Sequence, residues 1–279
     1  MRARENRRAG RSMAIAVVLG FAALHASRAG AAPLLSLSTD QIVERMVAMN
    51  RARAEALRSY SSTCIYRVEN GDRGRNAELV VKSVFLWPDR KESIIVSESG
   101  SSILLTRVLN RLLEGEAEAM QRENHRREEM SPQNYDFRLV GEEHSDSPDY
   151  YVLEVAPKFK DKLLLQGRIW VDARDFGIVR MEGAPAKNPS WWTTHVDVIH
   201  SYCKVGDFWL PERNETVAQV RIFGRSTLTI EYKDYRLIQA YSIRSATSGG
   251  EIPVGFRGQN SVALLYAQSG AQKTLNDAR

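Results

Sequence analysis

Few residues of this chain have the types and spacing needed for acid–base or metal chemistry. His195 and Asp197 are two positions apart in a strand-like segment, so they share a face, as the orienting pair of a hydrolase does. The sequence lacks a Gly-x-Ser-x-Gly elbow, a phosphate loop and a His-Glu-x-x-His motif. His200 is an odd number of positions from His195, which puts the two rings on opposite faces of a strand. We therefore expect a surface pair rather than a catalytic site, and no enzyme.

Two other groups of residues could bind a cation or form a disulfide. Residues 142–146 read EEHSD, but they are consecutive and precede Ser147-Pro148, as in a solvated hairpin turn. Cys64 and Cys203 are the only cysteines, and neither belongs to a metal or redox motif. They could pair in an oxidising compartment, and two buried free thiols are the alternative. The sequence thus predicts no metal and no cofactor.

The N-terminal residues have the organisation of a secretory signal peptide. A basic segment, MRARENRRAGR, precedes the apolar run Met13–Leu24, and Ala29-Gly30-Ala31 is a small-x-small cleavage site. The apolar run is short for a membrane span, so an uncleaved anchor is the less favoured alternative. We expect residues 1–31 to be the signal peptide, 32–237 the folded domain and 238–279 a flexible C-terminal tail.

The charge of the chain is concentrated in that N-terminal segment. The whole chain has 39 basic and 34 acidic residues, for a net charge of +5. Residues 1–31 contain six arginines and one glutamate, so 33 basic and 33 acidic residues remain. A neutral mature chain lacks the electrostatic footprint of a nucleic-acid-binding protein. We expect no nucleic-acid partner.

Hydrophobic periodicity predicts two helices and many short strands. Ser38 and Gln41 form a capping box at the start of a helix that the spacing extends to about Ser59. A second helix begins near Leu105 and becomes highly charged from Glu114 to Glu129. Its apolar stripe consists of Leu105, Val108, Leu109, Leu112 and Leu113. The expected strands are Thr63–Glu69, Glu78–Trp87, Ser93–Val96, Tyr135–Glu142, Tyr150–Ala156, Leu163–Asp172, Ile178–Glu182, Trp192–Tyr202, Phe208–Pro211, Thr216–Phe223 and Ser226–Tyr235.

Consecutive strands joined by tight turns predict an antiparallel meander. So many strands cannot form a flat sheet, so the sheet must curl and something must cover its apolar side. We expect an α+β, mainly β fold: a strongly curved antiparallel sheet, an unclosed half-barrel, with about two helices on the concave side. Trp87, Trp170, Trp191, Trp192 and Trp209 lie in or beside strands. They are interpreted as packing residues, with the lining of an apolar pocket as the alternative.

The hairpin GRIWVDARDFGIVRMEG (residues 167–183) and the segment FWLP (residues 208–211) carry a resemblance to a known family. With their flanking strands they resemble the bacterial outer-membrane lipoprotein-sorting, or LolA-like, proteins, over most of Ser38 to about Arg236. That resemblance implies a half-barrel whose concave side, plugged by helices, takes acyl chains in a hydrophobic cavity. It also implies a monomeric periplasmic carrier for a lipid or acylated lipoprotein, with partner proteins at the inner and outer membranes.

The cavity lining expected on this basis consists of Leu79, Val81, Phe85, Leu109, Leu113, Ile169, Val171, Val179, Met181, Trp192, Val196 and Val198. Arg168, Arg180 and Glu182 are expected to face water. The alternative function is a periplasmic sensory or scaffold domain of the same fold that binds a protein partner.

Overall fold

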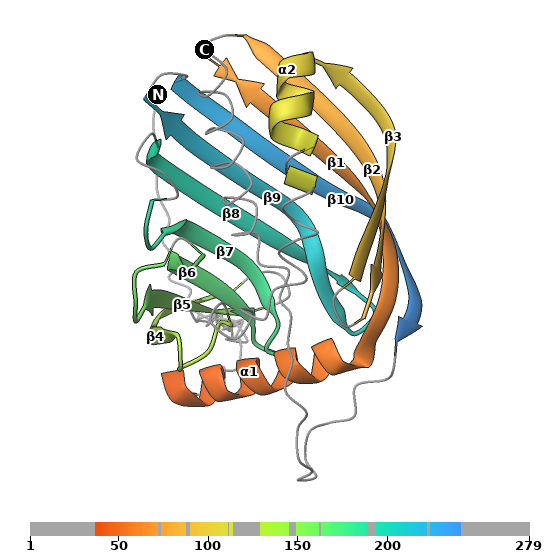
Figure 1. Cartoon of the computed structure of the whole chain (residues 1–279). Coiled ribbons are helices and arrows are strands. Elements are labelled where there is room, and N and C mark those ends of the chain that lie inside the picture. Colours follow the sequence, from red (N-terminus) through yellow and green to blue (C-terminus); the bar gives the residue numbers. More distant parts are fainter. Residues whose placement is uncertain are drawn as a thin grey trace, which may run out of the picture. The chain divides into compact units, whose positions relative to one another are not determined.

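A computed structural model describes residues 37–71, 74–87, 90–110, 112–113, 129–144, 149–161, 163–188, 193–221 and 224–240. Within these ranges the chain forms one ten-stranded antiparallel sheet and two helical segments (Figure 1). The sheet is strongly curved and does not close on itself, which confirms the expected mainly β half-barrel. The expected signal peptide, most of the expected C-terminal tail and most of the charged segment expected to extend the second helix lie outside the described residues.

The strands are β1 Leu57–Asn70, β2 Arg75–Leu86, β3 Arg90–Gly100, β4 Tyr135–Glu143, β5 Tyr150–Pro157, β6 Leu165–Asp172, β7 Ile178–Pro185, β8 Thr193–Val205, β9 Phe208–Val220 and β10 Gly224–Ala240. The helical segments are α1, Thr39–Ala56, and α2, Ser102–Leu104, which continues as the π-helix η2, Leu105–Leu109. Among the described residues, none of these helices has the length and apolar character needed to cross a bilayer.

The sheet consists of two meanders joined side by side. Its strand order is β3-β2-β1-β10-β9-β8-β7-β6-β5-β4, so every neighbouring pair except β1 and β10 is also consecutive along the chain. The first and last strands pair in antiparallel fashion from Leu57 opposite Ala240 to Asn70 opposite Ser226. This pairing places the first and last strands inside the sheet and leaves β3 and β4 as its edges.

Alternation along the strands separates a buried concave face from a charged convex face. In β1 the side chains of Cys64, Tyr66 and Val68 are buried, whereas the intervening Arg67 is half-exposed. On the convex side the Arg67 guanidinium pairs with the carboxylates of Glu78 and Glu231 on the two neighbouring strands. A period of two in each strand thus produces one apolar and one solvated face.

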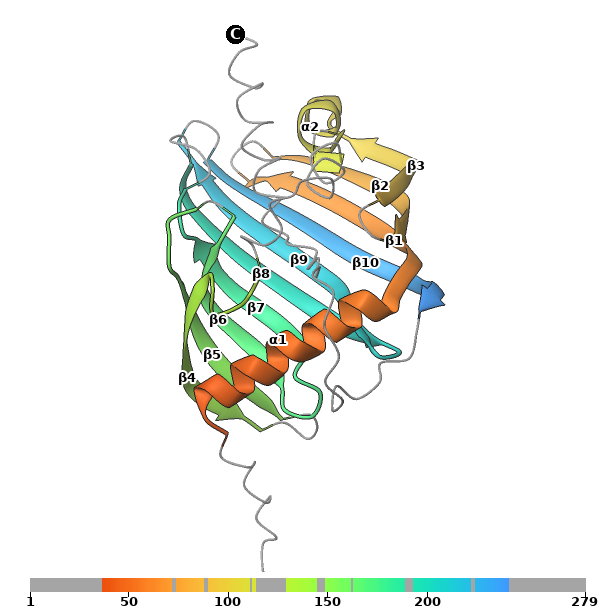
Figure 2. The same ribbon diagram turned by 60° about the horizontal axis from the view of Figure 1, so that its bottom comes forward.

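Helix α1 crosses one end of the concave face (Figure 2). The capping box is confirmed: the Ser38 hydroxyl accepts a hydrogen bond from the Gln41 backbone N–H, and the Gln41 side chain accepts one from the Ser38 N–H. Ile42 and Met46 are fully buried and form part of the apolar stripe of the helix. Its first residue, Thr39, accepts a hydrogen bond from the Leu139 backbone N–H of β4. The helix therefore ties edge strand β4 to β1 across the opening of the half-barrel.

Two opposing glycines allow the backbones of β6 and β7 to approach closely. Gly167 lies opposite Gly183 in the strand register. A Cβ atom on Gly167 would lie 2.0 Å from the Glu182 carbonyl oxygen, and one on Gly183 would lie 2.1 Å from that of Gln166. No side chain fits at either position. Glycine pairs of this kind are found where sheets bend sharply.

Three local expectations are corrected by the structure. Helix α1 ends at Ala56 and the chain enters β1 at once, because residues from Leu57 onward pair with β10 and β2. The two strands expected at Phe208–Pro211 and Thr216–Phe223 are a single strand, β9, since the polar residues between them pair with β8 and β10. The second helix begins earlier, at Ser102, and is π-helical from Leu105 to Leu109.

Candidate functional site

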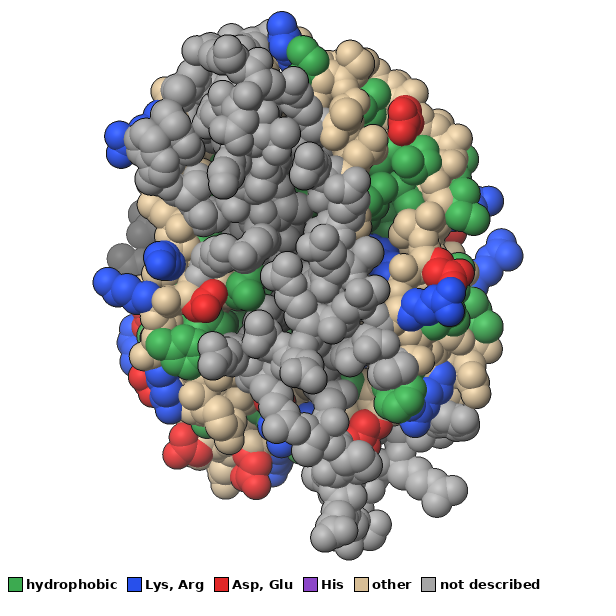
Figure 3. Space-filling model, in the orientation of Figure 1, with side chains coloured by type: hydrophobic (Ala, Val, Ile, Leu, Met, Phe, Trp, Pro, Cys, Tyr) green, Lys and Arg blue, Asp and Glu red, His purple; other side chains and the backbone are tan. Residues whose placement is uncertain are grey.

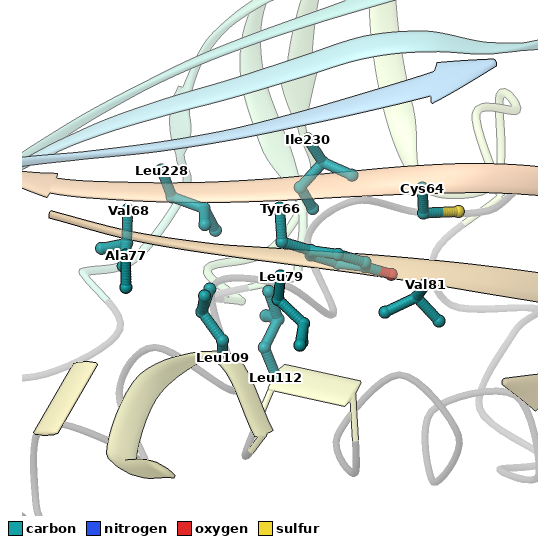
Figure 4. Close-up of a cluster of buried hydrophobic side chains, with 10 residues drawn as sticks. All are labelled: Cys64, Tyr66, Val68, Ala77, Leu79, Val81, Leu109, Leu112, Leu228 and Ile230. Carbon is teal, nitrogen blue, oxygen red and sulfur yellow. The ribbon is translucent and has the colours of Figure 1, made fainter. Parts of the chain in front are cut away.

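One apolar cluster on the concave face lies between η2 and three neighbouring strands. Leu109 and Leu112 point from the helical segment onto Tyr66 and Leu79, and all four side chains are fully buried (Figure 4). The other buried members are Cys64, Val68, Ala77, Val81, Leu228 and Ile230, and Leu113 packs against the cluster. The structure thus brings together four of the residues expected to line a cavity, Leu79, Val81, Leu109 and Leu113. Four members of the apolar stripe of the second helix, Leu105, Leu109, Leu112 and Leu113, thus pack against the sheet here.

A second apolar cluster lies on the same face across β6, β8 and β9. Leu165, Val196, Val198 and Ala218 are its buried members, and Met181 packs against them. Val196 and Val198 point to the same side of β8 because they are two positions apart. Both valines and Met181 were expected at a cavity, and the structure places the three in one apolar cluster.

A third apolar cluster lies beside the C-terminal end of α1. It contains Ala56, Tyr60, Phe208 and Leu210, with Phe85 and Tyr235 packed against it. The rings of Tyr60 and Phe85 stack with centroids 5.2 Å apart. Phe85, another expected lining residue, therefore packs against the end of the helix.

The remaining expected lining residues lie on β6 and β7 or outside the description. Ile169 and Val171 are fully buried, and Ile169 lies opposite both Leu153 and Met181. Val179 is half-buried and sits where the register between β6 and β7 shifts. Trp192 lies outside the described residues.

The two strands of this hairpin also have the expected solvated side. Arg168 and Arg180 are exposed, and Arg180 pairs with Glu182. The Arg180 guanidinium lies over the Trp170 ring, 5.5 Å from its centroid. Trp170 therefore belongs to the charged face.

The turn between β6 and β7 anchors the C-terminal end of α1. The Arg53 guanidinium donates to the backbone carbonyls of Asp175 and Asp207, at 2.7 and 3.2 Å, and lies 3.2 Å from the Asp175 carboxylate. The same carboxylate accepts hydrogen bonds from the Trp209 indole, the Lys204 ammonium and the Gly177 backbone N–H. A Cβ atom on Gly177 would lie 2.0 Å from the Trp209 ring, so only glycine allows the indole to reach Asp175.

Opposing effects determine the protonation of this anchor. Burial alone raises the pKa of Asp175, but hydrogen bonds from Lys204, Trp209 and Gly177 together with the charge of Arg53 bring that pKa below its ordinary value. Burial lowers the pKa of Arg53, and the nearby aspartates oppose this effect. Asp175 is therefore ionised at neutral pH. The turn therefore holds a largely buried ion pair.

A chain of polar side chains interrupts the apolar concave face. His200 of β8 is 2% exposed, and its Nδ1 lies 2.9 Å from the Asn214 Oδ1 of β9. The Asn214 amide in turn donates to the Tyr232 hydroxyl of β10 at 3.1 Å. Burial lowers the pKa of His200 to about 4, although the bond to Asn214 opposes this, so the ring is neutral at pH 7. Sequence reasoning placed His200 on the face opposite to His195 but did not foresee these partners.

The other chemistry-bearing residues do not form a reactive site. His195 and Asp197 form an exposed pair, with 3.0 Å between Nε2 and Oδ1, which confirms the expected surface contact. His144 lies 3.1 Å from the Asp149 carboxylate on the surface. Cys64 and Cys203 are not joined in a disulfide. Within the described part of the chain, no group of three or more His, Cys, Asp or Glu side chains could hold a metal ion.

Comparison with known proteins identifies similar solved structures but no family model. No family model and no curated protein matches the sequence. A LolA superfamily protein from Nitrosomonas europaea is 13% identical, with a TM-score of 0.33, and the match covers 72% of this chain and 94% of that one. A putative outer membrane lipoprotein-sorting protein domain from Vibrio parahaemolyticus is 14% identical, with a TM-score of 0.42 and the same coverage. The MucA/MucB complex of Pseudomonas aeruginosa matches at 13% identity and a TM-score of 0.24, over 68% of this chain and 93% of that one.

The first two of these structures are named for the family that the sequence resembles. At such identities and scores the likeness adds nothing about ligand or partner.

Proposed function

We propose that the protein is an exported, non-enzymatic binding protein that carries a lipid or acylated ligand on the concave face of its sheet. The observation that carries this proposal is the extent of apolar surface there. Three apolar clusters lie on this face, and among the described residues only α1 and the α2–η2 segment contribute helical cover. Figure 3 shows hydrophobic side chains on this face on either side of the atoms drawn in grey.

Burial of an acyl chain on such a surface can drive binding without any charged contact. Each methylene group removed from water contributes about 0.8 kcal/mol, so a sixteen-carbon chain gains roughly 13 kcal/mol when it is fully buried. Association itself costs about 4–15 kcal/mol. The net gain is small enough for release to a second carrier or membrane. The export expected from the N-terminal sequence puts the protein in a compartment where lipids move between two membranes.

Uptake of a fluorescent sixteen-carbon fatty acid by delipidated protein tests the proposal. We expect saturable binding that unlabelled acyl lipids displace, and mass spectrometry should detect acyl lipids that co-purify with the exported protein. A protein that takes up no acyl probe and co-purifies with no lipid would contradict the proposal.

A matched pair of isosteric variants locates the site. Val198 is buried in the concave face, and Val217, which lies beside it on β9, is half-buried on the convex face. Val198→Thr puts a hydroxyl against the acyl chain, whereas Val217→Thr puts the same group on the solvated side. We expect weaker uptake only for Val198→Thr. Equal effects of the two variants would show that the probe binds elsewhere.

Edge strand β3 supports a second candidate function, a scaffold that binds a protein partner. Ile94 and Val96 are 73% and 55% exposed, and β3 has no strand on its outer side within the described chain. An exposed apolar edge is a template for pairing with an extended segment. Ile94→Lys should then abolish partner binding and leave acyl uptake unchanged. If Ile94→Lys leaves partner binding intact, the edge is not the docking surface.

A further inference from the structure

The polar chain of His200, Asn214 and Tyr232 lies between two of the apolar clusters, the one under η2 and the one on β6, β8 and β9. Asn214 lies opposite Ile230, a member of the cluster under η2, and His200 lies opposite Met181, which packs against the cluster on β8. The three polar side chains come from adjacent strands of the same sheet. A ligand spread over both apolar clusters would therefore cross this chain of hydrogen bonds.

The hydrogen bonds within the chain determine which proton His200 carries. The Asn214 amide nitrogen donates to Tyr232, so the Asn214 carbonyl oxygen is the group that faces His200. A carbonyl oxygen only accepts, and Nδ1 of His200 must therefore carry the ring proton. The other ring nitrogen, Nε2, then presents a lone pair.

That lone pair has no partner among the described residues. Nε2 of His200 is buried and makes no hydrogen bond. A buried acceptor without a partner destabilises the folded protein, and buried polar atoms are almost always satisfied. Met181, which lies opposite His200, has no hydrogen-bond donor in its side chain, and the Tyr202 hydroxyl, on the same strand as His200, donates to the Met181 sulfur at 3.4 Å. An unsatisfied acceptor in the middle of an apolar face is a feature that a ligand donor would complete.

We propose that Nε2 of His200 accepts a hydrogen bond from a hydroxyl or amide N–H on the ligand, with the acyl chain lying on the apolar clusters to either side. The ligand class is thus a hydroxylated or amide-linked acyl chain, and this inference rests on the proposed lipid-binding function. A free fatty-acid carboxylate fits poorly, because it has no proton to donate to a neutral imidazole and would lose its hydration on this face. His200 acts as a specificity residue, and the apolar clusters supply most of the affinity.

Two probes of equal chain length separate the contribution of the hydrogen-bond donor to affinity from that of the acyl chain. 1-Hexadecanol carries a hydroxyl donor, and its methyl ether keeps the oxygen but lacks the proton. We expect wild-type protein to bind the alcohol about five- to tenfold more tightly than the ether, the range of one net hydrogen bond. His200→Phe, which keeps a ring of similar shape, should bind both probes equally and retain the affinity of the wild type for the ether.

The double variant His200→Phe/Asn214→Leu removes both partners of the hydrogen bond, so that no Asn214 carbonyl is left buried without a donor. This variant should also bind both probes equally. It can therefore replace the single variant in the test if His200→Phe alone does not fold. A direct readout is the ¹⁵N resonance of the His200 imidazole, whose Nε2 signal should shift on addition of the alcohol but not of the ether.

Failure of this inference is distinguishable from failure of the proposed function. If wild-type protein binds neither probe, the lipid-binding function itself is wrong. If it binds both probes equally, and His200→Phe changes nothing, the face binds acyl chains but His200 does not select among them. If palmitate binds more tightly than the alcohol and loses this advantage in His200→Phe, the ring pairs with a carboxylate, and the proposed donor is overturned.

Discussion

Replacement of Asp175 by asparagine tests whether the β6–β7 turn holds the end of α1 in place. The substitution keeps the shape of the side chain and removes its charge. The Arg53 side chain is only 6% exposed, so its guanidinium would lose the only carboxylate with which it forms an ion pair among the described residues. Removing one partner of a buried ion pair costs about 3–5 kcal/mol. Arg53 keeps two backbone carbonyl acceptors, so we expect a loss near the lower end, about 3 kcal/mol of unfolding free energy.

Chemical denaturation at neutral pH measures this loss, and an exposed pair supplies the control. Asp197→Asn makes the same chemical change in a pair whose two side chains are 66% and 59% exposed. Exposed pairs contribute about 0–1 kcal/mol, so the two variants should differ clearly. The double variant Arg53→Met/Asp175→Asn should recover part of the loss, because it leaves no buried charge without a partner.

The pH dependence provides a second test. The folded-state pKa of Asp175 lies below its unfolded value of 3.8. The carboxylate therefore contributes stability that is fully present above that value and is lost as the pH falls through the folded pKa. The difference between wild type and Asp175→Asn should shrink over the same interval. The anchor hypothesis is refuted if Asp175→Asn and Asp197→Asn lose the same free energy, or if the difference does not depend on acid pH.

Three further outcomes are expected. Replacing Leu109 and Leu113 with serine should lower the unfolding free energy of lipid-free protein by several kcal/mol, and by less with saturating lipid, because a bound acyl chain would replace the leucine side chains. If thermal melts show equal losses with and without lipid, the two leucines are ordinary core residues. Gly177→Ala should destabilise the protein by forcing the Trp209 ring away from Asp175, seen as a shift in indole fluorescence, whereas an unshifted spectrum would contradict the close packing. The pKa of His200 falls from 6.5 to about 4 on folding, so the protein is more stable above pH 6.5, where the ring is neutral in both states. Acidification towards pH 4 should remove roughly 3 kcal/mol of unfolding free energy. His200→Phe should flatten this part of the curve of stability against pH.

Some of the candidate site could be predicted because it depends on local periodicity. Val196 and Val198 share a face wherever their strand is placed, and so do Ile169 and Val171, since alternate side chains of a strand always point the same way. The capping box of Ser38 and Gln41 needs only four consecutive residues. The separation of His195 from His200 follows from the same alternation, and the structure leaves one ring exposed and the other buried.

Local pattern was misleading where tertiary pairing outweighed it. The polar residues around Asn214 looked like a break between two strands, yet they pair on both sides and continue β9. The helical spacing up to Ser59 gave way to β1 at Leu57, because β10 and β2 offer hydrogen-bonding partners there. The ion pair of Asp175 could not be foreseen, because its main partner, Arg53, lies 122 positions away in the sequence.

The sequence by itself determined the faces of the strands, the start of α1 and the mainly β, curved character of the sheet, because each follows from the order of neighbouring side chains. Only the tertiary structure decided that β1 pairs with β10, that Asp175 meets Arg53 and that His200 meets Asn214 and Tyr232. Each of these contacts joins segments that no periodicity relates, and forms only when the whole sheet has chosen its strand order and register. The candidate site combines the two: local alternation supplies the apolar clusters, and the strand order brings the polar chain between them.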